Sequence, residues 1–536
     1  MVPWLRWLAT IPVSWAFEGP HGVPPSGDSS SQTVIADEEF SCPDYSTHSL
    51  GHNKPISTGR YKLPYQRPIP ACRTFNVTDV EDTILGMKEA IRDPDLFRLF
   101  ENCFPNTLDT AITWKGKAKD KAGHKDEELT FITTGDIPAM WLRDSANQLQ
   151  SYLSLLRPSS APSSLASLFR GAINLQSRYI LSAPHCNAFY APSEANLTAS
   201  SYSFSSHDAV SPSPPPSVFE CKYELDSLAA FLQLSHDYHS ATSDTTFFSS
   251  SHSSWTTTIE TILNTTTELL AGTYTPDGTP SLPPYTFQRT TSSSYETLPN
   301  TGIGSPVKVG TGMVRSAFRP SDDACTYQLF IPGNMMFSSY LSLCAGIMEK
   351  VGRGDTARRM RSMAEGIRQG VERYGRTWHR RWGKIYAYEV DGFGGTAVMD
   401  DANIPSLLST PLSGYLDRND PIYQNTRRFV LSQDNPYYMF GAVINGTGGP
   451  HVGPGMAWPM SLIVRILTSD DDAEIVSSLK QILSSTNKLG LIHESVNSHD
   501  ASIWTRQWFS WANGLFGQMI LDLRERKPYL LTLSYQ

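Results

Sequence analysis

The chain has 536 residues, of which 40% are hydrophobic and 11% aromatic, ample material for one large packed domain or for two to three ordinary ones. This composition excludes intrinsic disorder, collagen and coiled coil for the bulk of the chain. With 44 basic and 52 acidic residues the net charge is −8, so no positive field argues for a nucleic-acid partner. Only 18% of the residues are charged, a balance that suits a protein that meets neutral polar ligands such as sugars.

The first 75 residues are rich in Pro, Ser and Gly and lack sustained periodicity. They predict a partly irregular N-terminal arm ahead of a single folded domain over 76–536. Within the arm, residues 1–18 contain a short apolar run broken by Pro12, the pattern of a weak secretory signal. We therefore expect a secreted protein or one of the secretory pathway, and an intracellular location stays open. No run of 18 apolar residues occurs, so neither a spanning helix nor a membrane partner is expected.

From Val77 onward, apolar residues recur at helical spacing, first as far as Phe100 with a break at Pro94. Further helices are predicted over 143–157, 162–182, 222–239, 253–271, 330–352, 354–376, 419–433, 456–468, 471–487 and 504–524. Strand patterns are confined to short runs such as 129–133 and 385–389. About a dozen helices with no fixed repeat predict an all-α fold, and paired helices closing into an (α/α)₆ barrel would explain this number. Separate helical bundles are the alternative.

Two polar loops, 200–218 and 273–320, are too long for ordinary connectors. Loops of this length in compact domains usually border a functional site or are disordered. The sequence has no HExxH motif, no Cys/His quartet and no EF-hand loop, so we expect no metal. A GxSxG elbow and a P-loop are absent as well, and no cofactor is expected.

Unusual polar and aromatic residues gather in four other places. The first is the segment 135–145, where Trp141, Arg143 and Asp144 arrive together at a helix start. An adjacent Arg–Asp pair offers donors and acceptors that match the vicinal hydroxyls of a sugar, and the Trp face suits a pyranose ring. A salt bridge at a helix start, with the Trp in the core, is the plainer interpretation.

The second place is 220–228, where Asp226 lies just off the apolar stripe of a predicted helix. A half-buried carboxyl can have a raised pKa through desolvation or a neighbouring carboxylate. The helix dipole acts in the opposite direction, so Asp226 needs burial or a second carboxylate to serve as an acid. A solvated Asp in the first helical turn is the alternative.

Tandem acidic residues mark the third place. Asp323 lies in the segment 319–324, with Asn334 further along, and Asp401 and Asn403 lie in a second such segment. Carboxylates beside apolar helices are costly to bury unless they are hydrogen-bonded, which implies a polar ligand or a structural network. Either pair could instead be a helix cap.

In the fourth place, Glu494 follows a short apolar run and precedes a segment with three Trp residues and Arg506. A Glu beside His493 and an aromatic wall resembles a base held in a sugar pocket. An ordinary buried Glu–Arg pair with core tryptophans is the alternative.

Taken together, these segments resemble glycoside hydrolase family 125. The matching blocks are GDIPAMWLRDSANQL, KYELDSLA, RPSDDACTYQLFIPGNMM, MDDANIPSLL, GPHVGPGMAWPMSL and HESVNSHDASIWTRQWFSWANGLFG. They occur in the family's order over about residues 75–525, and the loops and N-terminus fit a fungal-type member. The resemblance implies an (α/α)₆ barrel and a metal-independent, inverting exo-α-mannosidase that favours terminal α-1,6-linked mannose of mannans or N-glycans.

The resemblance also implies roles for individual residues. Asp226 would be the general acid and Glu494 the general base, while Arg143 and Asp144 would hold the terminal mannose. The further substrate-binding candidates in the matching blocks are Trp141, Asp323, Asn334, Asp401, Asn403, His451, Arg506 and Trp508. The partners implied are mannose-containing oligosaccharides, with no cofactor.

Two other functions compete with this interpretation. A glucoamylase- or trehalase-like barrel also uses carboxylate pairs and Arg–Asp clamps, and it would prefer other sugars. A non-catalytic glycan-binding protein would need neither carboxylate.

Overall fold

The computed structural model describes residues 41–118, 127–197, 207–249 and 253–536. Residues 43–536 form one compact unit. The predicted arm is therefore too long, because residues such as Leu63 and Gln66 are completely buried. Gln66 donates hydrogen bonds to the carbonyl groups of Ser49 and Leu489 and so ties this segment to the C-terminal part of the chain. The predicted signal segment 1–18 lies outside the described residues.

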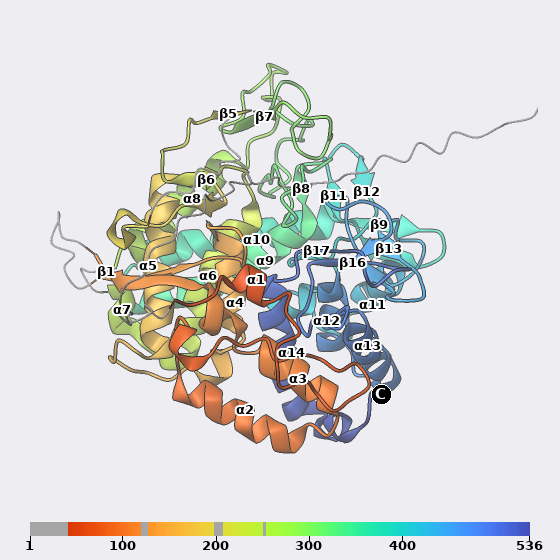
Figure 1. The fold of residues 1–536 in the computed structure, drawn as a ribbon. Helices are drawn as coiled ribbons and strands as arrows, with labels where there is room; N and C mark the ends of the chain where they lie inside the picture. The colour runs from red at the N-terminus through yellow and green to blue at the C-terminus, as the bar shows by residue number, and fades with distance from the viewer. Residues whose placement is uncertain (1–40, 119–126, 198–206, 250–252) are drawn as a thin grey trace, which may run out of the picture. The chain divides into compact units, whose positions relative to one another are not determined.

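An (α/α)₆ barrel is the architecture of this unit (Figure 1). The inner helices are α4 (Leu142–Gln150), α6 (Leu225–Thr242), α9 (Ile331–Lys350), α12 (Pro459–Leu467) and α14 (Ser510–Arg526). Around the ring α4 packs on α6 and α14, α6 on α9, and α12 on α14. The short turn η6 (Thr410–Ser413) packs on α9 in the remaining place.

The outer layer follows the predicted ranges closely. It consists of α2 (Thr78–Ala90), α3 (Pro94–Cys103), α5 (Leu165–Ser182), α8 (Trp255–Glu268), α10 (Gly354–Tyr374), α11 (Pro421–Val430) and α13 (Asp472–Ser484), with the short helices α1 (Tyr45–His48) and α7 (Thr245–Ser249) beside it. In α10 only one stripe is buried, including Met360, Ala364, Ile367 and Val371, as expected of a helix with one apolar face. In α4 all nine residues are buried. Polar residues of an inner helix therefore face other protein or a cavity.

Short strands lead into the inner helices. β3 (Met140–Trp141) precedes α4, β6 (Val218–Glu220) precedes α6, β8 (Leu329–Phe330) precedes α9, β15 (Met456–Ala457) precedes α12, and β17 (Trp504–Thr505) precedes α14. Four more strands join them: β4 (Ala188–Phe189), β11 (Glu389–Val390), β12 (Thr396–Ala397) and β16 (Ser495–Asn497). Together they form three antiparallel sheets of three strands each, in the orders β3-β4-β6, β8-β11-β12 and β15-β16-β17. These sheets fix where the inner helices begin.

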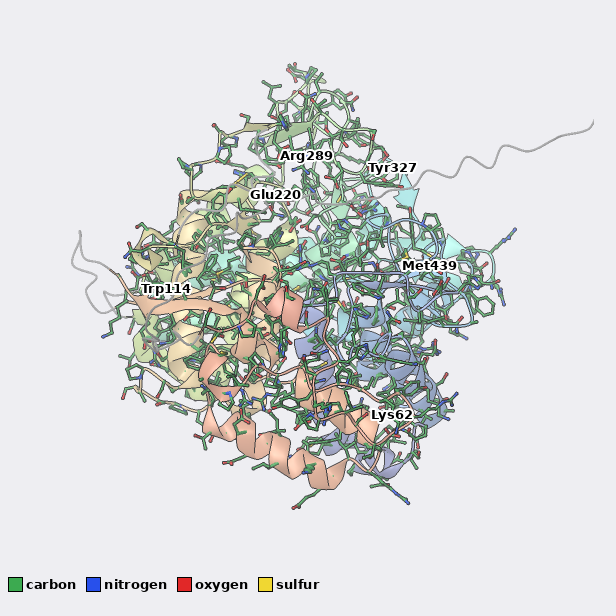
Figure 2. All side chains as sticks on the ribbon, viewed as in Figure 1. Lys62, Trp114, Glu220, Arg289, Tyr327 and Met439 are labelled. Carbon is green, nitrogen blue, oxygen red and sulfur yellow. A yellow bond between two sulfur atoms is a disulfide. The ribbon has the colours of Figure 1, made fainter. Side chains whose placement is uncertain are left out.

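The remaining strands form two-stranded sheets. They are β1 (Ile112–Lys117) with β2 (Glu128–Ile132), β9 (Arg376–His379) with β10 (Gly383–Tyr386), β13 (Tyr438–Met439) with β14 (Gly446–Thr447), and β5 (Asp208–Ser211) with β7 (Thr286–Arg289). The pair β5–β7 joins the two long loops of the sequence, and Figure 2 shows Arg289 at its end near Glu220. Among the described residues, no helix is long and apolar enough to cross a membrane.

Candidate active site

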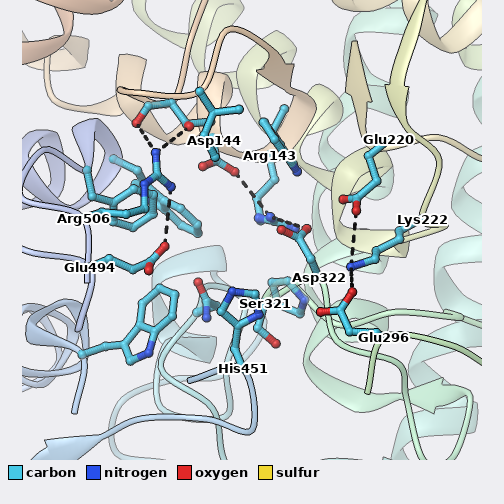
Figure 3. A pocket seen from close by; sticks show the side chains of 18 of the residues that line it. Arg143, Asp144, Glu220, Lys222, Glu296, Ser321, Asp322, His451, Glu494 and Arg506 are labelled. Carbon is cyan, nitrogen blue, oxygen red and sulfur yellow. Dashed lines mark hydrogen bonds and ion pairs between the residues drawn. The ribbon is translucent and has the colours of Figure 1, made fainter. Parts of the chain in front are cut away.

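A cavity of about 220 Å³ lies where the inner helices begin (Figure 3). Its lining combines carboxylates, cations and aromatic rings: Thr134, Ile137, Trp141, Arg143, Asp144, Glu220, Lys222, Arg289, Glu296, Pro320, Ser321, Asp322, Asn403, His451, Trp458, Glu494, Arg506, Phe509 and Trp511. The sequence therefore predicted seven of the lining residues: Trp141, Arg143, Asp144, Asn403, His451, Glu494 and Arg506.

Arg143, in the first turn of α4, is the central cation of the cavity wall. Its Nη1 lies 2.6 Å from Glu224 Oε2 and 3.2 Å from Asp226 Oδ2. Its Nη2 lies 3.3 Å from Asp322 Oδ1 and 3.4 Å from Asp144 Oδ2. Arg143 is only 3% exposed, and a buried charge needs such partners to offset its desolvation. Burial raises the pKa of Asp144 to about 6, although Arg143 opposes this shift.

Asp226 does not reach the cavity. The predicted general acid is completely buried behind Arg143 and is absent from the lining. Burial raises the pKa of Asp226 to about 6, although Arg143 lowers it. Asp226 thus has the burial that the sequence analysis required of an acid at this position. A general acid must nevertheless lie within hydrogen-bond reach of the atom that it protonates. In this structure Arg143 thus separates Asp226 from the cavity, and the acid role of Asp226 stays a prediction.

Asp322 is the carboxylate that enters the cavity from this side. It lies in the turn Arg319–Asp323, closed by a 2.7 Å hydrogen bond from Arg319 N to Asp323 O. A buried ion pair of Arg319 Nε with Glu389 Oε1, 2.5 Å long, anchors the turn. Asp322 has a backbone φ of 62°, a conformation uncommon outside glycine and found at functional sites. Its side chain is 22% exposed.

Glu224 and Asp322 form a carboxyl pair beside Arg143. Burial first, and then the neighbouring Asp322 and Asp226, hold the pKa of Glu224 well above its usual range, although Arg143 lowers it. Burial acts in the same direction on Asp322, but Arg143 and a hydrogen bond with Glu224 bring its pKa below the usual value. Two adjacent carboxyls that interact in this way share a proton. Asn187 Nδ2 lies 3.2 Å from both Glu224 Oε1 and Asp322 Oδ1 and holds the pair together.

Glu494 stands on the opposite wall of the cavity (Figure 3). Thr505 Oγ1 donates a 2.9 Å hydrogen bond to Glu494 Oε2, and Arg506 Nη1 lies 3.5 Å from Glu494 Oε1. Arg506 also pairs with Asp136 at 2.6 Å. Gly135 allows these segments to meet, because it has a φ of 134° and a Cβ there would lie 2.6 Å from Trp508 O. Glu494 is thus held in place with one face toward the cavity.

His451 and Asn403 line the cavity with the help of buried aspartates. His451 Nδ1 lies 3.1 Å from Asp323 Oδ1. Burial lowers the pKa of His451, but Asp323 dominates and raises it to about 10. The imidazole is therefore a cation at neutral pH. Asp401 Oδ1 accepts hydrogen bonds from the backbone and the side-chain amide of Asn403, both 3.0 Å long. Asp323 and Asp401 thus support the lining without belonging to it.

Two predicted binding residues have structural contacts instead. Asn334 accepts a hydrogen bond from Val314 N and donates to the carbonyls of Val314 and Phe330, which fixes the start of α9. Trp508 donates from Nε1 to Asn106 Oδ1 over 3.1 Å and packs edge-on against Tyr45. Neither side chain lines the cavity, because a polar or aromatic residue beside a site can equally serve the packing around it.

The long loops bring an ion network that the sequence did not assign to the site. Lys222 Nζ lies 3.4 Å from both Glu220 Oε1 and Glu296 Oε2. Arg289 also pairs with Glu220 and Glu296, at 3.0 and 2.6 Å, and makes a two-pronged contact with Asp208. In the sequence, only the unusual length of the two loops indicated that they border the site. Trp511, a lining residue, belongs to the three-Trp segment that the sequence linked to a sugar pocket. Neither Trp511 nor Trp458 was singled out, because no pattern separates them from core tryptophans.

Several buried polar atoms around the cavity have no hydrogen-bond partner among the described residues. They include the indole Nε1 atoms of Trp141 and Trp458 and the Nε atom of Arg143. Native structures rarely leave such atoms unpaired. Together with apolar ring faces they match a ligand with several hydroxyl groups on an apolar ring, which is a sugar. Among the described residues, no group of His, Cys, Asp and Glu could hold a metal ion.

A helical barrel whose cavity offers sugar-binding groups between opposed carboxylates defines a glycoside hydrolase of the (α/α)₆ type. Residues 93–521 match the model of the metal-independent α-mannosidases, GH125. The chain belongs to this family.

Two similar proteins illustrate the extent of the likeness. A Streptococcus pneumoniae enzyme from a family of metal-independent α-mannosidases, described as a non-productive substrate complex with α-1,6-mannobiose, shares the fold with a TM-score of 0.73. Its identity is 31%, and the match covers 84% of this chain and 99% of that chain. The Meiotically up-regulated gene 157 protein of Schizosaccharomyces pombe is 48% identical over 493 residues, 91% of this chain and 94% of the relative.

Proposed function

We propose that the protein is an inverting exo-α-mannosidase that removes terminal α-1,6-linked mannose from mannose-containing oligosaccharides. Membership of the α-mannosidase family supports the sugar. The α-1,6-mannobiose bound to the Streptococcus relative supports the linkage. An exo mode of action fits a cavity of about 220 Å³, small beside the ~300–1,000 Å³ of pockets for larger ligands.

The observation that carries the proposal is the placement of Glu494 and Asp322 on opposite walls of one cavity (Figure 3). An inverting glycosidase needs a base and an acid separated by roughly 6.5–9.5 Å, which leaves room for a water molecule. Glu494 takes one proton from this water as the water oxygen bonds to the anomeric carbon. The carboxyl pair Asp322–Glu224 delivers its proton through Asp322 to the glycosidic oxygen as the bond between that oxygen and the anomeric carbon breaks. Exchange with solvent then restores both groups.

The remaining lining groups have roles that follow from their charge and hydrogen-bonding capacity. Arg143 and Asp144 offer donors and acceptors to vicinal hydroxyls of the terminal mannose. His451, as a cation, and Asn403 add further donors. The rings of Trp141 and Trp458 cover apolar faces of the sugar.

We also propose a location in the secretory pathway or outside the cell. A disulfide joins Cys186 to Cys221, and Cys42 and Cys72 are disulfide-bonded as well. Such bonds form and persist in oxidising compartments. Localisation of the tagged full-length chain tests this, and a uniform cytosolic signal with reduced cysteines would argue against it.

Proton NMR of α-1,6-mannobiose hydrolysis tests the catalytic proposal. The first product must be β-mannose, seen before mutarotation, because water attacks the face opposite the leaving group. A first product with the α configuration would mean retention and would overturn both carboxylate roles. Hydrolysis of α-1,2- and α-1,3-mannobiose at equal rates would refute the linkage preference.

A further inference from the structure

A second cavity, of about 250 Å³, lies further along the same inner helices. It is as large as the catalytic cavity of about 220 Å³. Its lining comes from α4, α6, α9, α14, the turn before and within η6, and Leu153, which follows α4. Arg143 and Trp511 line the first cavity, and Asn147 and Leu515, one helical turn further on, line the second. The two cavities therefore follow one another inside the barrel.

Side-chain amides dominate the polar lining of this second cavity. Asn147, Gln150, Gln233 and Gln518 contribute from three helices. Gln150 is only 8% exposed, and its Nε2 donates a 2.9 Å hydrogen bond to Asp237 Oδ2. The Oε1 atoms of Gln233 and Gln518 are buried and have no hydrogen-bond partner among the described residues. The cavity thus contains two strong hydrogen-bond acceptors that a bound ligand with donor groups would satisfy.

The charge of the lining excludes an anionic ligand. Asp237 is the single ionisable carboxyl in it, and no Lys, Arg or His belongs to the lining residues. Burial raises the pKa of Asp237 to about 7, although Gln150 lowers it. The hydroxyls of Ser406, Ser409 and Thr410 complete the polar surface. These groups recognise a neutral ligand rich in hydroxyls.

The second cavity also has apolar lining side chains and partly exposed residues at its edge. Tyr340, Met336 and Leu515 supply apolar contact surface, each at most 6% exposed. Leu412, at 36% exposure, lies at the edge of the cavity, and Gln518 and Asp237 are partly exposed. Apolar surface beside convergent amides, hydroxyls and a carboxyl is the combination that binds a pyranose.

We infer that this second cavity is a binding site for a neutral hexose, separate from the catalytic cavity. The inference stands on the size and lining of the cavity and needs no hydrolysis. Only the choice of mannose as the first probe rests on the proposed function. Asn147 Nδ2 donates a 2.9 Å hydrogen bond to the carbonyl of Arg143, so an occupied second cavity lies in direct contact with the helix that carries the catalytic arginine.

The methyl group of Met336 reports on this cavity alone, because Met336 lines it and does not line the first. The full chain is labelled at its methionine methyl groups, and Met336→Leu assigns the signal. Titration with D-mannose in the millimolar range should shift the Met336 signal with saturation. Replacing Gln233 or Gln518 by Leu removes one amide each and should weaken this binding roughly five- to tenfold. The matched control Gln369→Leu, at an exposed position of α10, should leave it unchanged.

Three outcomes would overturn the inference. The Met336 signal could stay fixed throughout the mannose titration of the unmodified chain. It could shift equally in the Gln233→Leu and Gln518→Leu variants, or it could respond to ammonium chloride and not to mannose, which would mean a cation site. Because the first titration uses the unmodified chain, a negative result there cannot be explained by misfolding of a variant. A saturable shift in a chain that fails to hydrolyse mannobiose would uphold this site and refute the proposed function.

Discussion

Replacing Asp322 by Asn should abolish the supply of a proton to the leaving group while leaving the cavity intact. Asn tolerates the left-handed backbone that φ of 62° requires here, so the turn should keep its shape. Arg143 loses one partner at 3.3 Å but retains Glu224 at 2.6 Å and Asp226 at 3.2 Å. The expected effect is therefore on catalysis and not on folding.

The magnitude follows from the role. A general acid supplies about 10²–10⁴-fold in rate, which corresponds to about 2.7–5.5 kcal/mol of transition-state stabilisation at 1.36 kcal/mol per tenfold. Asp322→Asn should lose this amount in kcat/KM for α-1,6-mannobiose. An activated aryl α-mannoside, whose leaving group needs no proton, should lose much less. The assay compares both substrates with the unmodified enzyme at one pH.

Asp226→Asn is the matched control, because it makes the same chemical change at a completely buried carboxyl. Breaking a buried ion pair typically costs 3–5 kcal/mol of stability, so this variant should melt earlier. Any loss of activity should be similar for both substrates, since Asp226 touches neither. The reasoning is refuted if Asp226→Asn shows the leaving-group dependence and Asp322→Asn does not.

Three further predictions concern metal removal, the ion pair of His451 with Asp323, and the disulfide. Activity should survive excess EDTA, and a loss that calcium or zinc restores would contradict the metal-independent assignment. His451 has a folded pKa of about 10, above the unfolded value of about 6.5, so its pairing with Asp323 stabilises the fold fully below pH 6.5 and is lost as the pH rises through 10. The melting temperature of His451→Gln should accordingly fall less over this interval than that of the unmodified chain, and parallel curves would argue against the pairing. Cys186→Ser with Cys221→Ser opens a link across a sequence separation of 35 residues and should cost about 3–4 kcal/mol in denaturant unfolding, with activity reduced because Asn187 beside it holds the carboxyl pair. Unchanged unfolding midpoints would mean that the native contacts alone fix this segment.

The local spacing of apolar residues was sufficient to predict the outer helices. The observed helices α5 (165–182) and α10 (354–374) lie within the predicted ranges 162–182 and 354–376, because an outer helix carries an apolar stripe that the sequence displays directly. The range predicted over 143–157 ends early, at Gln150 of α4, since the chain turns there to leave the barrel wall. The sequence predicted only loops where β5 and β7 lie, because these two strands pair with each other across a long sequence separation.

The amino-acid sequence by itself determined the helical barrel, the family and seven residues of the cavity wall, since long blocks such as the one around Arg143 and Asp144 carry this information locally. Only the tertiary structure decided which carboxylate lines the cavity. Asp226 and Asp322 both lie in acidic clusters of matching blocks, and no local pattern tells which side chain faces a cavity. Arg143 separates the two in space: it covers Asp226 from one side and leaves Asp322 partly exposed on the other. Burial depends on contacts between α4, α6 and the turn that holds Asp322, and such contacts exist only once these distant segments have packed together.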